Sequence, residues 1–306
     1  MSNLERRPAE ESCEGHRGEV SPPVQQLEPR EVPLGGPRAM TVRRTLPHKR
    51  IRTVGAWCFV DHYGPDDVDM SVPPHPHIGL QTVTWLTAGQ ILHRDSLGSE
   101  QVIRAGQLNL MTAGQGVSHA EQSTGTYAGE LEGIQLWVAQ PEATRHGEPA
   151  FEHHAELPQL DLANATATVI VGELGGTTSP ARRDTDHLGA ELRLRSGETT
   201  MPLESHHEHA LVVLDGAVEV DGTTVAPGHL AYLGTARDEL GLRASEPATA
   251  ILLGGTPFPE QLFMWWNFVA RTSDEVDEAR ASWNADDGRF GTVDSPLERI
   301  PAPARI

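Results

Sequence analysis

Two residue pairs in the first half of the chain have side chains and spacing suited to metal binding. His75 and His77 open the stretch "HPHIGLQTVTWL", and His119 and Glu121 lie within "TAGQGVSHAEQS". Residues two apart in a β-strand project from the same face, so each pair presents its side chains together. Two facing strands could therefore bring three imidazole nitrogens and one carboxylate to a single point.

This donor set favours a transition metal with open coordination positions. It does not suit Ca²⁺, which takes oxygen ligands, or a structural zinc site built from thiolates. Cys13 and Cys58 are the only cysteines, too few for a thiolate cluster, and we do not expect a disulfide between them. Chance is the competing explanation, because the chain holds 15 histidines and a histidine in a sheet usually makes only a hydrogen bond.

Short apolar runs bounded by turn residues indicate the elements that position these pairs. "LQTVTWL", "GQLNLMT", "LEGIQLWVA", "TATVIVGEL" and "HALVVLDGAVEVDG" predict many short strands, as in a sandwich or barrel. Asp221-Gly222 is a favoured hairpin turn. "SDEVDEARASWN" predicts a helix with Ser273 as its N-cap and Val276, Ala279 and Trp283 on one face.

The two halves of the chain look alike. "VTWLTAGQILHRD" and "LVVLDGAVEVDG" each run an apolar strand into a glycine turn and a second strand, which aligns Gly89 with Gly216. The pattern predicts two copies of one β-fold. In this alignment the positions of His75 and His77 fall on Pro202 and Glu204, so the second half lacks the same donor pairs.

Several segments resemble the pirin family of the cupin superfamily. They are "VDHYGP", "PPHPHIGLQTVTWL", "LHRDSLGSEQVIRAGQLNLMTAGQGVSHAEQS", "LWVAQP" and "GGTPFPEQLFMWWNFVARTSDEV", spread over roughly residues 39–292. The resemblance implies an all-β fold of two consecutive cupin jelly-roll barrels with a short C-terminal helix. We divide the chain into a mobile polar leader (1–38), a metal-binding N-terminal barrel (39–165), a C-terminal barrel with the helix (166–292) and a tail (293–306).

The resemblance also implies one metal in the first barrel, bound by His75, His77, His119 and Glu121. It favours Fe²⁺, although the residues themselves do not discriminate among Fe, Mn, Ni, Cu and Zn. Gln81 stands where many relatives have Glu, and it could orient a ligand imidazole instead.

Further residues are candidates for supporting roles. His93 and Asp95 could line the cavity or pair with each other, and His62 reads as structural. Leu80, Leu92, Leu110 and Met111 are apolar candidates for the cavity. His206, His207 and His209 could be solvated or could bind a second metal.

The family includes quercetin-type flavonol 2,3-dioxygenases, so the first functional hypothesis is a metal-dependent oxidoreductase acting on a flavonol and O₂. Glu121 would serve as ligand and as the base for the substrate hydroxyl. The alternative is a non-catalytic, metal-dependent regulatory protein that binds a transcriptional or metabolic partner. A third hypothesis is a structural protein of the seed-storage type with two cupin barrels, which the complete set of four metal-ligand residues disfavours.

Charge and composition limit the partners. The formal net charge of −19 disfavours direct binding to nucleic acid. The sequence shows no signal peptide or membrane segment, so we expect a cytoplasmic protein. A monomer is the simplest expectation.

Overall fold

The structure is a computed structural model that describes residue 5 and residues 7–15, 17–34, 40–67, 69–124 and 129–305. It confirms the predicted fold class, which is mostly β-strand with one short helix near the C-terminus and two cupin halves. Within the described residues each half is a pair of facing sheets rather than one continuous closed barrel.

The first half contains a seven-stranded and a four-stranded sheet. The larger sheet has the order β13 (Ala150–His154), β10 (Leu108–Thr112), β7 (Leu80–Ala88), β12 (Glu130–Ala139), β5 (Trp57–Asp67), β4 (Met40–Leu46) and β3 (Arg30–Leu34). The smaller has the order β6 (Ser71–His77), β11 (Val117–Ser123), β8 (Gln90–Asp95) and β9 (Glu100–Arg104).

The second half repeats this plan. Its larger sheet has the order β14 (Gln159–Leu162), β15 (Ala165–Val171), β18 (His187–Leu194), β25 (Ala248–Gly255), β20 (Glu208–Asp215), β23 (Leu230–Gly234) and β2 (Gln25–Leu27). The smaller has the order β19 (Gly197–Pro202), β24 (Glu239–Ala244), β21 (Val218–Val220) and β22 (Thr223–Val225), and β16 (Glu173–Leu174) pairs with β17 (Thr177–Thr178). The change of sheet falls between β13 and β14, so β14 belongs to the second half although we predicted the boundary at 165/166.

The turn residues behave as the sequence predicts. Asp221 and Gly222 both have positive φ, 48° and 76°, as a two-residue hairpin turn requires, and they join β21 to β22. Gly89 and Gly216 also share positive φ, 86° and 70°, at the ends of β7 and β20. The equivalence of these two central strands supports the predicted repeat.

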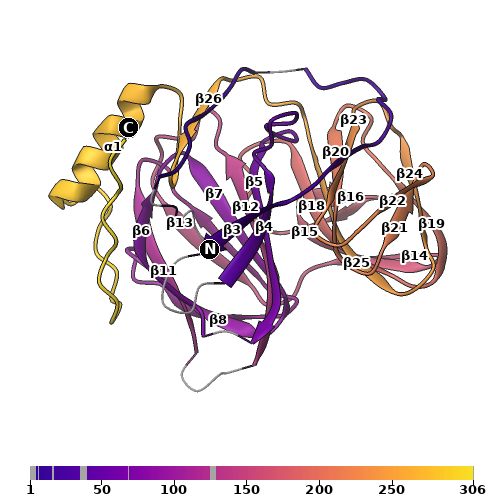
Figure 1. The fold of residues 1–306 in the computed structure, drawn as a ribbon, viewed down its shortest axis with the longest axis horizontal. Coiled ribbons are helices and arrows are strands. Elements are labelled where there is room, and N and C mark those ends of the chain that lie inside the picture. Colours follow the sequence, from indigo (N-terminus) through magenta and orange to yellow (C-terminus); the bar gives the residue numbers. More distant parts are fainter. Residues whose placement is uncertain are drawn as a thin grey trace.

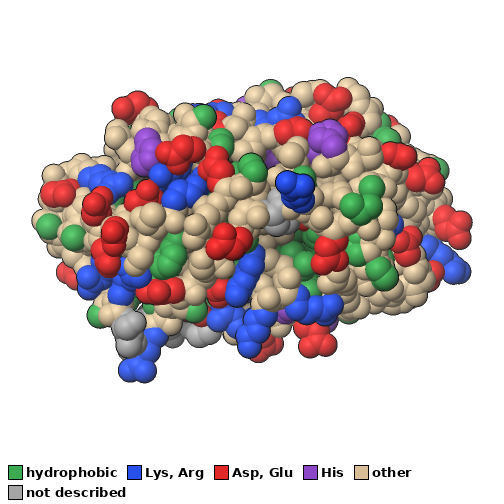
Figure 2. Space-filling view, turned by 90° about the horizontal axis from the view of Figure 1, so that it is seen from above, with side chains coloured by type: hydrophobic (Ala, Val, Ile, Leu, Met, Phe, Trp, Pro, Cys, Tyr) green, Lys and Arg blue, Asp and Glu red, His purple; other side chains and the backbone are tan. Residues whose placement is uncertain are grey.

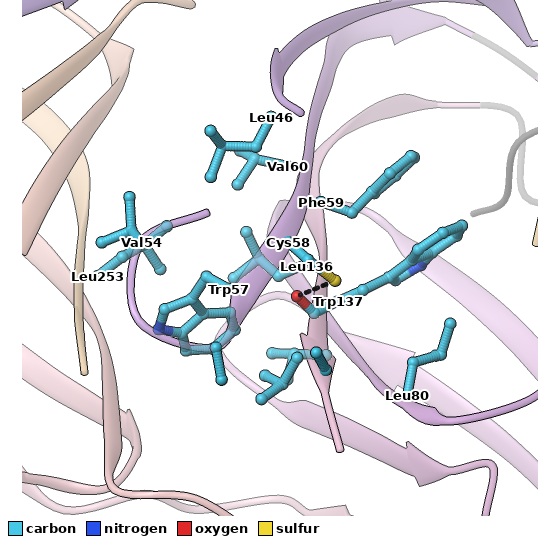
Figure 3. Packing of buried hydrophobic residues seen from close by; sticks show 14 of the residues in the cluster. Leu46, Val54, Trp57, Cys58, Phe59, Val60, Leu80, Leu136, Trp137 and Leu253 are labelled. Atoms are coloured by element: carbon cyan, nitrogen blue, oxygen red, sulfur yellow. Dashed lines mark hydrogen bonds between the residues drawn. The ribbon is translucent and has the colours of Figure 1, made fainter. Parts of the chain in front are cut away.

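The two seven-stranded sheets face each other in the middle of the molecule, with the four-stranded sheets outside (Figure 1). Trp57 of β5 joins them, because its indole N–H lies 3.1 Å from the carbonyl oxygen of Leu188 and 3.0 Å from that of Gly254. Figure 3 shows this fully buried ring in a core that also includes Val54, Leu136 and, from β25, Leu253. The halves therefore share one apolar core. Cys13 and Cys58 are both free and buried.

The N-terminal leader crosses to the second half. Its β2 adds an outer strand beside β23, with Leu27 paired to Leu230, while β3 pairs with β4 of the first half. β1 (Glu11–Cys13) pairs with β26 (Leu262–Trp265). The prediction of a mobile leader is wrong for its described strands, because pairing with other strands buries three of its apolar side chains, Cys13, Leu27 and Val32, although Val20 stays exposed. Residues 1–4, 6, 16 and 35–39 lie outside the described residues.

The C-terminal segment makes the opposite crossing, back to the first half. After β25 the chain forms β26, β27 (Phe268–Ala270) and α1 (Ser273–Ala285), which Figure 1 shows beside β6. The helix is confirmed, but its N-cap is Thr272, whose hydroxyl accepts a hydrogen bond from the Glu275 N–H. The tail continues along β6, where the Ile300 N–H donates to the Pro74 carbonyl.

On the face in Figure 2, acidic side chains are spread over the surface with basic ones among them. α1 has 13 residues, and no helix among the described residues is long and apolar enough to cross a membrane.

The attachment of the leader can be tested at Leu27, which is 1% exposed. We expect Leu27→Ala to lower the free energy of unfolding by about 2–5 kcal/mol, the usual range for truncating a buried leucine. Urea unfolding followed by tryptophan fluorescence measures this. Gln26→Ala, on the same strand, is the matched control and should change stability by no more than about 0.5 kcal/mol. Equal effects of the two substitutions would contradict the observed pairing of β2 with β23.

Candidate metal centre

Strand β6 presents two imidazoles to the interior of the first half. His75 and His77 lie two residues apart and are fully buried, while Pro74 and Pro76 alternate with them. Prolines are tolerated here because β6 is an edge strand of the smaller sheet, where a missing N–H breaks no inner ladder. The sequence "HPH" therefore encodes an edge strand with two inward-facing histidines.

Strand β11 brings the second pair opposite the first. His119 pairs in register with His75, and a β-bulge separates His119 from Glu121. The ligand nitrogens of His75, His77 and His119 all lie within 4.8 Å of one another, and the Nε2 atoms of His77 and His119 are 3.1 Å apart. Glu121 is buried but belongs to a second, overlapping group with His93 and His119.

Backbone carbonyls fix the orientation of two of these imidazoles. His75 Nδ1 lies 2.7 Å from the carbonyl oxygen of Pro73, and His77 Nδ1 lies 3.0 Å from that of Asn267. In each case Nδ1–H donates to the carbonyl, so the ring's lone pair is on Nε2. Such a hydrogen bond behind a ligand histidine is the usual way that proteins orient metal-binding imidazoles.

Burial keeps the three imidazoles neutral. Desolvation lowers the pKa of His75 to about 4, and it lowers the pKa values of His77 and His119 well below 6.5. Neutral imidazole is the form that binds a metal, so the three side chains are in their ligand state at pH 7 without loss of a proton.

A short chain of polar groups lies behind His119. Its Nδ1 is 3.4 Å from His93 Nδ1, and His93 Nε2 is 3.2 Å from the Asp95 carboxylate. His93 also stacks on Phe151, with ring centroids 4.5 Å apart. His93 and Asp95 pair with each other, one of the two roles considered, and His93 also reaches His119 of the histidine cluster.

Polar residues also cover the opposite wall, on the larger sheet. Thr84 Oγ1 of β7 is 3.3 Å from Glu121 Oε1 and 3.0 Å from Gln135 Oε1 of β12. Next to them Arg44 and Asp61 form a buried ion pair, with two nitrogen–oxygen distances of 2.7 and 2.8 Å. Sequence patterns gave no signal for Thr84 or Gln135, which read as ordinary strand residues.

In the second half the positions equivalent to these donors are apolar by contrast. The strands corresponding to β6 and β11 are β19 and β24, and they contribute Met201, Leu240 and Leu242 to a large apolar cluster. Leu211 of β20, which aligns with Thr84, lies in the same cluster. The donor sets described above therefore occur only in the first of the two repeats, among the described residues.

Other predicted residues have different surroundings. Gln81 Nε2 donates to Thr112 at 2.9 Å rather than to a ligand imidazole. His62 is buried, 3.5 Å from Glu132, in keeping with a structural role. Leu92 points away from the interior, because on β8 it alternates with the buried His93. Leu80, Leu110 and Met111 are buried in the core.

Comparison with known proteins agrees with this architecture. The family model for pirin matches residues 39–138, and the model for the pirin C-terminal cupin domain matches residues 190–291. A Pseudomonas aeruginosa protein named "Putative quercetin 2,3-dioxygenase" is 44% identical over 92% of this chain and 90% of its own length. The chain belongs to the pirin family.

Solved structures place the chain among these cupins. A quercetin 2,3-dioxygenase from Acinetobacter baumannii is 39% identical, covers 92% of this chain and 95% of its own, and superposes with a TM-score of 0.88. The Escherichia coli pirin YhhW, solved with nickel(II), shares the fold at a TM-score of 0.63 and 15% identity over 76% of this chain and 99% of its own. Pirins and quercetinase-like cupins bind a metal, and this chain has candidate histidine and glutamate sites for one.

The low pKa of His75 predicts the acid sensitivity of the metal-free protein. Between pH 6.5 and about 4, His75 is protonated in the unfolded chain but stays neutral in the folded chain. Stability should therefore fall as pH falls through this window, by up to about 1.4 kcal/mol per pH unit for each such histidine. Urea unfolding of chelator-treated protein at several pH values measures the slope.

His75→Gln should reduce that slope, whereas substitution of the exposed His146 by Ala should leave it as in the original protein. An identical slope in His75→Gln would show that His75 titrates normally in the folded state.

Proposed function

We propose that His75, His77, His119 and Glu121 together bind one divalent transition metal. Three buried imidazoles within 4.8 Å support this set, and Glu121 lies beside His119 on the same strand. Fe²⁺ is our first choice, with Mn, Ni, Cu or Zn compatible with the same donors. His93 is the competing ligand, since its nitrogen lies within the overlapping group.

We further propose that the protein is an oxidoreductase of the flavonol 2,3-dioxygenase type, with a quercetin-like flavonol and O₂ as substrates. The single observation that carries this proposal is the cluster of buried, neutral histidines in the first half. The names of relatives that are 39% and 44% identical over nine-tenths of the chain point to the same reaction. We place the protein in the cytoplasm as a monomer.

The protein's own residues would prepare the substrate for this reaction. Glu121, held near Thr84, would accept the proton of the substrate 3-hydroxyl at a carboxylate oxygen. The buried wall around it would keep water from the resulting anion. A metal held by the histidines would supply Lewis acidity for the substrate oxygen and redox chemistry toward O₂.

The alternative function is a metal-dependent regulatory protein that binds a protein partner without turnover. The histidine cluster suits it equally, because a bound metal alone would change the local charge and order. The nickel-bound pirin of the same fold is named for its metal and family, not for a reaction. Turnover separates the two functions.

The ligand set can be tested by substitution and metal analysis. His75→Ala, His77→Ala and His119→Ala should each remove the metal, because each deletes a donor. His93→Phe preserves a ring against Phe151 and should weaken binding by only about 10–100-fold, as expected for a residue that orients a ligand. Elemental analysis and competition with a chelator measure both effects. Loss of metal in His93→Phe together with its retention in His75→Ala would replace our set with His93, His119 and Glu121.

The reaction can be tested by oxygen uptake with quercetin. We expect uptake by protein reconstituted separately with Fe²⁺, Mn²⁺, Ni²⁺ or Cu²⁺, with one metal best, and none in His75→Ala. Glu121→Gln should lower the rate by at least about 10²-fold, the usual contribution of a general base, and metal content should be measured beside it. His229→Ala, in the second half, is the matched histidine control and should keep full activity.

No uptake with any metal, in protein shown to hold one, would reject the dioxygenase proposal and favour the regulatory alternative.

A further inference from the structure

A second cluster of donor groups lies in the other half, where three neighbouring strands of the larger sheet end together. His187 of β18 and Glu208 of β20 both pair in register with Gly255 of β25. The adjoining residues, Asp186, His207 and Thr256, are therefore at the same level across three strands. The turn before β20, closed by the hydrogen bond from the His207 N–H to the Glu204 carbonyl, adds His206 to this row.

One carboxylate oxygen in this cluster has too many donors. Asp186 Oδ2 lies 3.0 Å from Nε2 of His206, 3.0 Å from Nε2 of His207 and 3.3 Å from the Thr256 hydroxyl. A carboxylate oxygen has two lone pairs, so three donors exceed what it can accept in good geometry. The ligand atoms of Asp186, His206 and His207 all lie within 4.8 Å of one another.

We infer that Asp186, His206 and His207 bind a divalent transition metal such as Zn²⁺. Two imidazoles and one carboxylate are a common donor set for Zn²⁺, with water in the remaining position. A metal would resolve the crowding, because each imidazole would offer Nε2 as a Lewis base instead of donating its proton to the carboxylate. This site is separate from the histidines of the first half and does not depend on the proposed dioxygenase function.

Two buried histidine groups behind the cluster are consistent with an ion there. His207 is almost fully buried, and its Nδ1 has no hydrogen-bond partner among the described residues. His209, two residues on and fully buried, lacks a described partner at both ring nitrogens, and its ring centroid is 5.9 Å from that of His207. Buried polar atoms of this kind are uncommon and often mark an ion or water nearby.

Asp186 supplies the one carboxylate of the set, and its Oδ2 faces the two imidazoles. Arg183 lies 3.1 Å from its other oxygen, Oδ1, which directs Oδ2 toward the imidazoles. The strongly acidic chain attracts cations to the surface as a whole.

The position of this site links it to the contact between the halves. His187, next to Asp186, packs edge-on against Trp57 at a centroid distance of 5.2 Å. Glu208, next to His207, accepts a hydrogen bond of 2.8 Å from the Gly55 N–H of the first half. An ion that fixes these strand ends would hold both contacts in place. Binding to the folded state alone also raises the unfolding temperature.

The test is titration of metal-stripped, full-length protein with Zn²⁺, with bound metal counted by elemental analysis and Zn²⁺ affinity measured by calorimetry. We expect His206→Ala to bind one equivalent less than the original protein, or to bind it at least about tenfold more weakly, since loss of a ligand should exceed loss of a group that orients one. The same difference should appear in a His75→Ala background, where the first-half site is disabled. In the His75→Ala background, Co²⁺ should give a visible absorption band that the additional His206→Ala substitution removes.

Controls separate ligand loss from damage to the fold. His206 is 57% exposed, so its truncation leaves the core intact, and Asp186→Asn removes the charge with little change in shape. His146→Ala, at an equally exposed histidine, should bind as much Zn²⁺ as the original protein. Added Zn²⁺ should raise the unfolding temperature of His75→Ala but not of His75→Ala/His206→Ala. Unchanged stoichiometry and affinity in both His206→Ala and Asp186→Asn would overturn the inference.

Discussion

The hydrogen bond from His77 to the carbonyl of Asn267 ties the candidate metal centre to the far end of the chain. It fixes which nitrogen of the imidazole carries the lone pair, and it does so with a backbone group that side-chain changes cannot remove. Asn267 follows Trp266, which adopts a left-handed conformation at φ 55° in the tight turn between β26 and β27. That turn is held in place by the packing of Trp265, Phe268 and the helix α1 around Ile78.

The two halves share a fold but differ in what fills them. The second has a large cluster of aliphatic side chains, which stabilise it by burial of apolar area, and its buried His187, His207, Glu208 and His209 lie at strand ends outside that cluster. The first buries several imidazoles, carboxylates and a guanidinium, each of which must find a partner because unpaired polar groups in a protein interior are costly. The apolar core around Trp57 contains residues of both halves, so apolar side chains of the second half also stabilise the first half and its buried polar groups.

Much of the fold and the centre could be predicted from local patterns. Strand periodicity, the Asp221-Gly222 turn and the helix after Thr272 depend on neighbouring residues, and each was predicted within a residue or two. His75, His77 and His119 could be singled out because spacing by two in a strand fixes a common face. The position of Glu121 relative to the three histidines was harder to predict, because a β-bulge shifts the strand register between His119 and Glu121.

Long-range features could not be predicted in the same way. The strand formed by Leu27 depends on an open sheet edge two hundred residues away, and no local signal distinguishes it from an irregular leader. Asn267 acts through its carbonyl, which every residue has, so its identity carries no information about the contact. The location of α1 on the first half likewise depends on the path of the chain after β25, not on the helix sequence.

The exchange of terminal segments has a consequence for biosynthesis. Asn267 lies 190 positions after His77, so a ribosome must complete almost the whole chain before the imidazole acquires its backbone partner. When the first half emerges, His77 still lacks its hydrogen bond to Asn267. Strand β2 is synthesised early, but it cannot pair until β23 of the second half has emerged. Contacts of such sequence separation form late. The oriented form of His77 therefore belongs to the nearly complete polypeptide, and each half includes a segment from the other end of the chain.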